Sequence, residues 1–317
     1  MRLEEACGQF LLSGRAGGWS EATEAQYRWQ LQRWRSVMAE KGIVDVDQVT
    51  ASALREFGAG LAGRFALSTR RTAAISLRGF LKWCQSEELL EIGDKLAKGV
   101  KAPKVPRQAQ RTVSSAEVEQ LFDACVEPVK NGLSQAAADA ARLRNAAIIS
   151  LLFDSLLRSH ELCRLVTADL DLDRQRVLVR GKGGKKSWVR YGADTAERLR
   201  AWLAVRETVA KSDLLFVGCG GSTPGKGLTP NGLRAILKRI GKRAGVEDIT
   251  THAFRRGGAV AQLEAGAPSR LVQMHGRWDD IRMIEVYTQQ LEADSLFDRY
   301  SPIEQLGKNG HSRETTR

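Results

Sequence analysis

The chain has 317 residues, enough for two globular domains that each bury a core of their own. Its apolar stretches are far shorter than a membrane span, and its first residues lack the runs of a signal peptide, so we expect a soluble, unsecreted protein. The formal charge of +12 favours a polyanionic partner. A basic charge alone would equally suit a ribosomal protein or a membrane-surface protein.

The distribution of charge and of cysteine narrows the class further. Residues 1–106 contain 16 Lys and Arg against 12 Asp and Glu, and residues 107–317 contain 33 against 25, so both parts are basic. The cysteines are an odd number, widely spaced, with no C-x-x-C pair and no histidine at zinc-ligand spacing. We therefore expect reduced thiols and no bound metal. The cysteines are Cys7, Cys84, Cys125, Cys163 and Cys219.

The first hundred residues have helical periodicity and no convincing strand pattern. Residues 19–40 place apolar side chains at helical spacing behind Ser20, a residue suited to cap a helix. Similar patterns cover residues 50–63, 68–88 and 91–98. Residues 98–111 form a basic, Pro-containing stretch without periodicity, which indicates a linker. We predict an all-helical first domain over residues 1–106.

The second domain, residues 112–317, mixes helices with one hairpin. Ser114 and Glu117 have the spacing of a capping box. Residues 176–191 change to β-rich segments around Gly181-Lys-Gly-Gly-Lys, which predicts a hairpin with Lys182 near its turn. Helical patterns cover residues 143–153, 194–210, 230–244, 252–265, 268–274 and 280–288, and a further helix begins near Arg158. A C-terminal tail begins at about residue 289.

Two segments resemble ligand-binding loops but lack a required residue. Residues 220–226 nearly spell a phosphate-binding P-loop, yet Gly227 stands where a Ser or Thr must hold magnesium. The segment Asp169-x-Asp171-x-Asp173 begins like a calcium loop, but it lacks the required Gly and terminal Glu. We expect a flexible loop and a solvated turn, and no cofactor.

The most informative segment is Thr250-Thr-His-Ala-Phe-Arg-Arg-Gly-Gly. In a helix, His252 and Arg255 project from one face near the N-terminus, where the macrodipole also favours an anion. That face offers a proton-transfer group and a bidentate phosphate ligand. Trp278 lies 23 residues after Arg255, and Tyr287 lies nine residues after Trp278.

This order and spacing resemble the catalytic domain of tyrosine recombinases, the family of phage integrases, the Xer recombinases and Cre. The segment Ser155-Leu-Leu-Arg-Ser-His-Glu-Leu resembles the family's first box and supplies Arg158 and Glu161. The hairpin resembles the one that carries the family's lysine, and Gly276-Arg-Trp resembles the stretch before the fifth catalytic position. The resemblance implies a mainly α fold with a small β-sheet, arranged as a C-shaped clamp. Its arms are a helical core-binding domain and an α+β catalytic domain.

Chemistry assigns roles to these residues. Attack on a DNA phosphodiester develops negative charge at the phosphate, which Arg158 and Arg255 are suited to stabilise. Tyr287 is the expected nucleophile, and His252 accepts or positions its proton. Lys182 is the expected general acid for the departing 5′ oxygen.

Two further residues complete the expected site. Trp278 would orient the phosphate and support Tyr287, and Glu161 would support its neighbours. The resemblance implies a site-specific recombinase or integrase that works through a 3′-phosphotyrosyl intermediate without metal or ATP. A type IB topoisomerase and a DNA-binding regulator that does not cleave remain alternatives.

Several residues compete with this assignment or depart from the family pattern. Lys185 and Lys186 share the hairpin turn with Lys182, and Tyr300 is a rival nucleophile. His275 falls three residues short of the family's histidine position. Two departures are Leu156, which replaces a common Gly, and Arg256, which replaces a frequent second His.

The resemblance also implies partners. These are double-stranded DNA recombination sites and further copies of the chain, with four protomers on two sites and an exchange of C-terminal tails. A cytoplasmic, nucleoid-associated protein of bacterial or phage type is expected, with no membrane partner. The candidate DNA-contacting residues, each of which could equally belong to a solvated charged face, are Arg70, Arg71, Arg78, Lys82, Lys185, Lys186, Arg234, Lys238, Arg239, Lys242 and Arg243.

Overall fold

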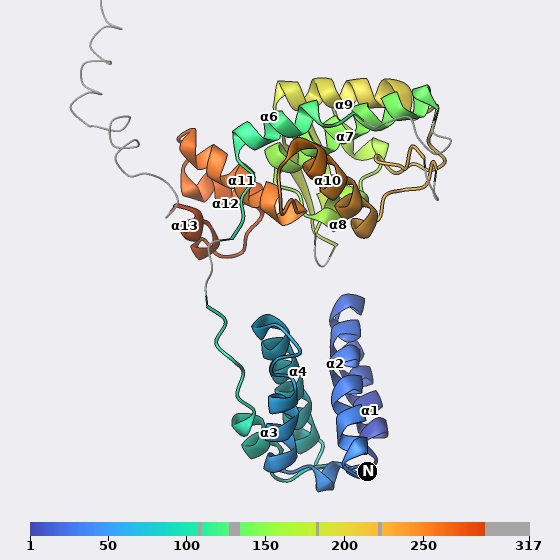
Figure 1. Ribbon diagram of the computed structural model, residues 1–317. Coiled ribbons are helices and arrows are strands. Elements are labelled where there is room, and N and C mark those ends of the chain that lie inside the picture. The colour runs from blue at the N-terminus through green and yellow to red at the C-terminus, as the bar shows by residue number, and fades with distance from the viewer. Residues whose placement is uncertain (107–109, 127–133, 182–183, 221–223, 289–317) are drawn as a thin grey trace, which may run out of the picture. The chain divides into compact units, whose positions relative to one another are not determined.

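The computed structural model describes residues 1–106, 110–126, 134–181, 184–220 and 224–288, with backbone alone for 286–288. The chain divides into two compact units, residues 1–108 and 109–317 (Figure 1). Within the described residues, every helix is too short or too polar to cross a membrane.

The described part of the first unit is all-helical. Its elements are α1 (Leu3–Ala16), α2 (Glu21–Glu40), the short 3-10 turn η1 (Val46–Gln48), α3 (Ala51–Gly60), α4 (Leu67–Ser86) and α5 (Gly93–Gly99). The Ser20 side chain accepts a hydrogen bond from the Thr23 amide, so α2 begins where its capping residue predicts. The sequence therefore located four of these five α-helices, with small differences at their ends.

The core of the first unit is aromatic. Trp34 and Phe80 are fully buried, and Phe10 packs edge-on against Trp19, Tyr27 and Phe80. Edge-on aromatic pairs are favourable beyond the area that they bury. Phe10 belongs to α1, which was not predicted from the sequence although its buried residues repeat at helical spacing, and this helix completes the core.

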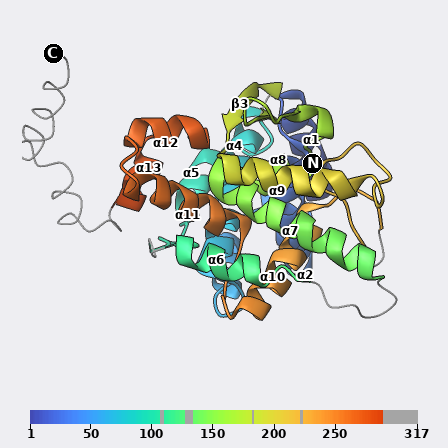
Figure 2. The ribbon, with the colours of Figure 1, turned by 90° about the horizontal axis from the view of Figure 1, so that it is seen from above.

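The described part of the second unit combines helices with a small antiparallel sheet, whose two longer strands alternate buried and more exposed residues. The helices are α6 (Ser115–Asp123), α7 (Gln135–Ser155), α8 (Ser159–Cys163), α9 (Ala193–Arg206), α10 (Pro230–Ala244), α11 (Thr251–Glu264), α12 (Ser269–Gly276) and α13 (Arg282–Thr288), with the 3-10 turn η2 (Thr167–Asp169). The long helices α7 and α9 lie side by side (Figure 2). Ser114 and Glu117 form the expected capping box at α6.

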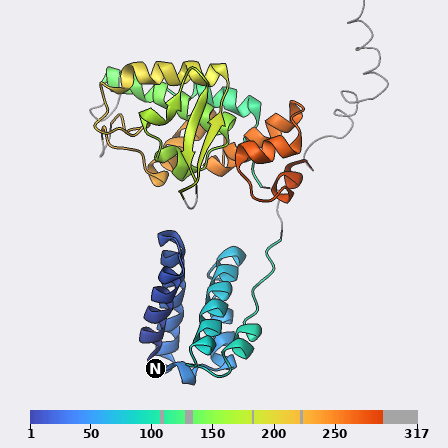
Figure 3. The ribbon, with the colours of Figure 1, turned by 180° about the vertical axis from the view of Figure 1, so that it is seen from behind.

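The sheet contains the predicted hairpin and one strand more. Strands β2 (Arg176–Arg180) and β3 (Lys186–Arg190) pair antiparallel, with Leu178 opposite Trp188 (Figure 3). Strand β1 (Leu170–Asp171) pairs with β2 and was not predicted. Alternate residues Val177, Val179 and Val189 point into the core, as the two-residue period of a half-buried hairpin requires.

The expected solvated turn is confirmed at residues 172–175, where Asp173 is exposed ahead of β2, but the expectation was wrong at Asp169. The Asp169 side chain is 2% exposed and accepts two hydrogen bonds of 2.7 Å from the Arg180 guanidinium. It also accepts from the Val166 amide at 3.0 Å. A buried carboxylate needs such partners, and the partner lies eleven residues away across the sheet, where local sequence does not reveal it.

Two adjacent glycines position α11 within the second unit. A Cβ at Gly257 would overlap the Val113 carbonyl, and a Cβ at Gly258 would overlap the Phe153 carbonyl. Helix α11 therefore packs its own backbone against the backbone at the end of α7. A smaller core joins α11 to α12 and α13 through Leu156, Ala259, Leu263, Val272 and Ile284.

Candidate active site

Leu156, at the end of α7, has a left-handed backbone conformation that sets the direction of the chain toward Arg158. Leu156 has φ 54°, a conformation that costs a side chain free energy, and its side chain is fully buried. Burial of this leucine in the smaller core offsets the backbone cost that a glycine would avoid. The chain then turns so that Arg158 stands at the start of α8, with one third of its side chain exposed.

Glu161 binds Arg158 through both its backbone and its side chain. One carboxylate oxygen accepts from the Arg158 amide at 2.7 Å, and the other accepts from its guanidinium at 2.9 Å. Arg277 donates to Glu161 at 2.8 Å. Burial opposes the charged form of Glu161, but Arg277 and Arg158 together hold its pKa below the usual range. The carboxylate is thus a buried negative charge between two arginines.

Arg255 lies deeper than Arg158. It is 4% exposed on α11, and its guanidinium donates to the carbonyls of Leu156 and Gly276. Its guanidinium carbon lies 4.0 Å from the centre of the Trp278 ring, within the range of a cation–π contact. Arg158 donates to the next carbonyl, that of Arg277, at 3.3 Å. The two predicted phosphate ligands therefore meet at consecutive carbonyls of one segment.

Trp278 is packed tightly against this segment. A Cβ at Gly276 would overlap its ring, so the close approach requires glycine there. The indole is half-buried and packs on the smaller core of α11, α12 and α13. The Trp278 ring thus supports the Arg255 guanidinium. The chain continues from Trp278 toward α13.

His252 stands near the N-terminus of α11, whose cap is the Thr250 side chain. Loss of hydration and the positive charges of Arg256, Arg255 and Arg158 lower the pKa of His252. The imidazole is therefore neutral at pH 7, the form that can accept a proton.

Two residues near this cluster were missed by the sequence analysis. His160 lies two positions after Arg158, and the two histidines His160 and His252 interact electrostatically. Loss of hydration lowers the pKa of His160, and Arg158 contributes in the same direction. Arg277 was noticed only as part of a motif. Its side chain is 16% exposed and pairs with Glu161. The signal for both was their position beside the recognised arginine and tryptophan.

His275, the alternative histidine of the sequence analysis, forms hydrogen bonds that connect neighbouring elements. His275 Nε2 donates to the Arg190 carbonyl at 3.0 Å, since a carbonyl can only accept, and Nδ1 lies 3.0 Å from the Gln262 amide nitrogen. Gln262 in turn donates to the Asp154 carbonyl at 3.2 Å. This chain of bonds joins β3, α12, α11 and α7 and commits both ring nitrogens.

The described tyrosines differ in what surrounds them. Tyr287 lies on α13, which packs against α11 and α12 through the buried Ile284 three residues earlier. Tyr191 is buried, its hydroxyl has no hydrogen-bond partner among the described residues, and burial raises its pKa to about 12. Tyr27 packs in the core of the first unit. Tyr300 lies outside the described residues, as do the other tail residues after 288.

Two of the three hairpin lysines lie among the described residues. Lys182 lies outside the described residues, whereas Lys185 and Lys186 are exposed at the start of β3. The base of the turn is closed by a 2.8 Å bond from the Gly181 amide to the Lys185 carbonyl. The Asp169–Arg180 pair anchors the strand that leads into the turn.

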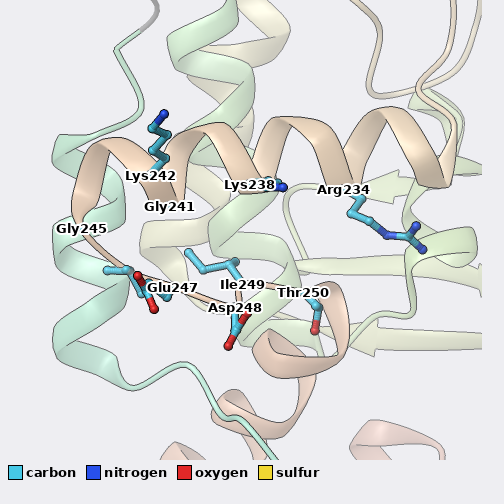
Figure 4. A pocket seen from close by; sticks show the side chains of 10 residues that line it. Arg234, Lys238, Gly241, Lys242, Gly245, Glu247, Asp248, Ile249 and Thr250 are labelled. Atoms are coloured by element: carbon cyan, nitrogen blue, oxygen red, sulfur yellow. The ribbon is translucent and has the colours of Figure 1, made fainter. Parts of the chain in front are cut away.

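The basic residues of α10 lie in two rows. Arg234, Lys238 and Lys242 recur every four residues and line a cavity of about 540 Å³ with residues 245–250 (Figure 4). Thr250, the cap of α11, is among the residues that line this cavity. Arg239 and Arg243 form the other row, and Arg243 donates to the Ala124 carbonyl at 3.0 Å.

The basic residues of the first unit bind its own chain. Arg78 donates to the Val100 carbonyl, and Arg71 donates to the Pro103 carbonyl at 3.4 Å. Lys82 lies 4.0 Å from Asp94. Arg70 lines a cavity of about 380 Å³ between α3, α4 and residues 99–103. Arg71 and Arg78 thus hold the segment that follows α5 against α4.

Known proteins resemble the chain over both units. Residues 111–294 match the family model described as Phage integrase family, and residues 12–88 match that described as Phage integrase, N-terminal SAM-like domain. Tyrosine recombinase XerC of Corynebacterium glutamicum is 31% identical over 276 residues, covering 86% of this chain and 82% of the relative. Tyrosine recombinase XerC of Pseudomonas aeruginosa is 30% identical over 281 residues, covering 87% of each.

The fold also matches a solved structure. A lambda integrase dimer bound to a COC′ core site aligns with a TM-score of 0.69 at 13% identity, covering 90% of this chain and 77% of that one. The sequence relatives and the family match identify the class of enzyme as well as the fold. The chain belongs to the phage integrase family and is a tyrosine site-specific recombinase.

Proposed function

We propose that the chain cuts and rejoins DNA strands through a covalent bond between Tyr287 and a 3′ phosphate. The observation that carries the proposal is the meeting of Arg158 and Arg255 at the consecutive carbonyls of Gly276 and Arg277. Two guanidinium groups held by the scaffold offer fixed positive charge to a phosphate whose negative charge grows during attack. The helix that carries Tyr287 packs against the helices that bear this segment and Arg255.

The proposed step exchanges one phosphodiester bond for another, so no outside source of energy is needed. The Tyr287 oxygen bonds to phosphorus, the bond to the 5′ oxygen breaks, and the phenolic proton passes to His252 or to solvent positioned by it. Lys182 gives a proton to the departing 5′ oxygen. In the second step a free 5′ hydroxyl of a partner strand attacks the phosphotyrosine and releases Tyr287. Arg158 and Arg255 hold the non-bridging oxygens in both steps.

A nicked DNA duplex that loses a short 5′ fragment on cleavage tests this proposal. Wild-type protein should accumulate a protein–DNA adduct that survives denaturation, because the lost fragment cannot attack it. Tyr287→Phe should give no adduct. Tyr191→Phe is the matched control, since that buried hydroxyl has no hydrogen-bond partner among the described residues. Adducts with Tyr287→Phe would refute the assignment, and relaxation of supercoiled DNA without strand exchange would favour a topoisomerase.

Double-stranded recombination sites are the proposed substrate. The row of Arg234, Lys238 and Lys242 lines a cavity whose wall also contains Glu247, Asp248 and Thr250, the cap of the helix that bears His252 and Arg255. A DNA backbone held along this row would continue toward the two arginines. The SAM-like match and the basic charge of residues 1–106 support a DNA-binding role for the first unit.

A tetramer on two DNA sites is the proposed assembly, with the tail after residue 288 docking on a neighbouring protomer. Leu271, Met274 and Met283 are exposed apolar side chains on α12 and α13, and they supply a surface that such a tail could cover. Deletion after Gln289 should leave monomers on DNA, measured by light scattering. Deletion after Ser301 should preserve assembly. We also propose that the protein acts in the cytoplasm on nucleoid DNA, which its similarity to bacterial recombinases supports.

A further inference from the structure

We infer that Arg277 is a positioning residue that keeps the Arg158 guanidinium available to the phosphate. This inference rests on the proposed function and concerns the same site. Arg277 is absent from the set of residues that the sequence analysis assigned to catalysis. Its contacts nevertheless reach Arg158, through the Arg277 carbonyl, and the Glu161 carboxylate that pairs with Arg158.

Arg277 and Arg158 share one carboxylate. Glu161 uses one oxygen for the Arg158 guanidinium, at 2.9 Å, and the other for the Arg277 guanidinium, at 2.8 Å. The second oxygen also accepts from the Arg158 amide. Because Arg277 occupies that oxygen, the Arg158 guanidinium cannot form the two parallel bonds that an isolated arginine and carboxylate prefer. The Arg158 side chain instead remains one third exposed.

The backbone of Arg277 also helps to position the Arg158 guanidinium. Its φ of 57° turns the chain so that the carbonyls of residues 276 and 277 accept from Arg255 and Arg158 respectively. The Arg277 guanidinium also donates to the His275 carbonyl at 3.0 Å, two residues back, which braces this turn. One residue therefore controls the distance of Arg158 from Glu161 and the placement of the carbonyls that hold both arginines.

Arg277 is an unfavourable choice for stability alone. A left-handed conformation is strained for a long side chain and free of strain for glycine. Its Nε is buried with no hydrogen-bond partner among the described residues, and burial lowers its pKa. Strain, an unsatisfied donor and a buried charge at one position are typical of functional sites rather than of ordinary packing.

Arg277→Gly tests the inference, because glycine fits the backbone and removes the side chain. At saturating nicked DNA, we expect at least a tenfold lower rate of adduct formation with an unchanged or higher melting temperature and unchanged DNA affinity. Arg277→Lys, which restores one positive charge opposite Glu161, should recover part of the rate. Arg174→Gly, in an exposed turn with a surface ion pair, is the matched control and should cleave normally.

A second measurement does not depend on cleavage. Nitrogen-15 NMR of the arginine side chains without DNA, with Arg158 assigned through Arg158→Lys, should show slower hydrogen exchange at Arg158 in Arg277→Gly, as it closes onto Glu161. Normal cleavage by Arg277→Gly, or a loss that follows the melting temperature and is not relieved by lysine, would overturn the inference. Absence of any wild-type adduct with the NMR change intact would instead count against the proposed reaction.

Discussion

The Arg255 guanidinium carbon lies 4.0 Å from the centre of the Trp278 ring, and Gly276 lies against the same ring. The ring face, more than the indole N–H, therefore supports the arginine. Trp278→Phe should retain most of the cleavage rate, because phenylalanine keeps an aromatic face. Trp278→Ala should lower stability by about 2 kcal/mol, less than a fully buried tryptophan because the ring is half-buried, and should slow cleavage at least tenfold. Equal loss in both variants, measured by single-turnover adduct formation, would assign the N–H the main role.

The pH dependence of cleavage should follow His252. Loss of hydration and nearby arginines lower its pKa, so the neutral base is fully present above about pH 6.5 and is lost as pH falls through the lower folded value. The cleavage rate should be level above that pH and decline toward pH 5. His252→Gln should give a slow rate with a flatter profile. An unchanged wild-type profile in this variant would exclude His252 as the proton acceptor.

Stability should depend on pH through a different histidine. Burial lowers the pKa of His275, so the unfolded chain binds more protons than the folded chain below about pH 6.5. This stabilising contribution is complete above that pH and is lost as pH falls through the folded pKa. The melting temperature should therefore drop between pH 7 and pH 5, and His275→Gln should reduce the drop. A drop of equal size in the variant would contradict this source of acid sensitivity.

The hairpin lysines can be separated with a modified substrate. Replacing the departing 5′ oxygen by sulfur creates a leaving group that needs no proton. Lys182→Ala should cleave ordinary DNA at least a hundredfold more slowly and the sulfur-containing DNA at nearly the wild-type rate. Lys185→Ala and Lys186→Ala should cleave both substrates alike. Rescue of one of these variants in place of Lys182→Ala would move the general acid to that position.

The two rows of α10 should differ in the salt dependence of DNA binding. Removing a lysine that contacts phosphate lowers the slope of log affinity against log salt by about 1. We expect this change for Lys238→Ala, which removes a side chain from the cavity row. Arg243→Ala should alter the slope less, because Arg243 donates to the Ala124 carbonyl. Equal slopes for both variants, measured by fluorescence anisotropy, would remove the distinction between the rows.

The sequence was most informative where local chemistry determines structure. Ser20 and Ser114 each cap the helix that they predict, and the glycine-rich turn lies between paired strands. Such signals depend on residues within four positions of one another. Helix α1 has no such signal at its start, since Arg2 precedes it without a side-chain cap bond, and it was not predicted although its buried residues repeat at helical spacing.

Tertiary arrangement limited the prediction of the site. The order of Arg158, His252, Arg255, Trp278 and Tyr287 predicted which segments matter, and the family match covers all of them. The sequence did not predict that Glu161 divides its two oxygens between arginines, since Arg277 lies 116 residues away. Nor did it predict left-handed backbone at Leu156, where burial of the side chain offsets the preference for glycine, or at Arg277.

The glycine pair in α11 has a consequence for engineering. At Gly257 and Gly258 the helix touches the backbone of two other segments with no side chain between them, so it has no soft layer to absorb a change. An added methyl group at position 258 must push the helix bodily away from the end of α7. Arg255 would move with the helix while Arg158 stayed with its own segment. The size of the residue at position 258 therefore sets the distance between Arg255 and Arg158 without changing either residue.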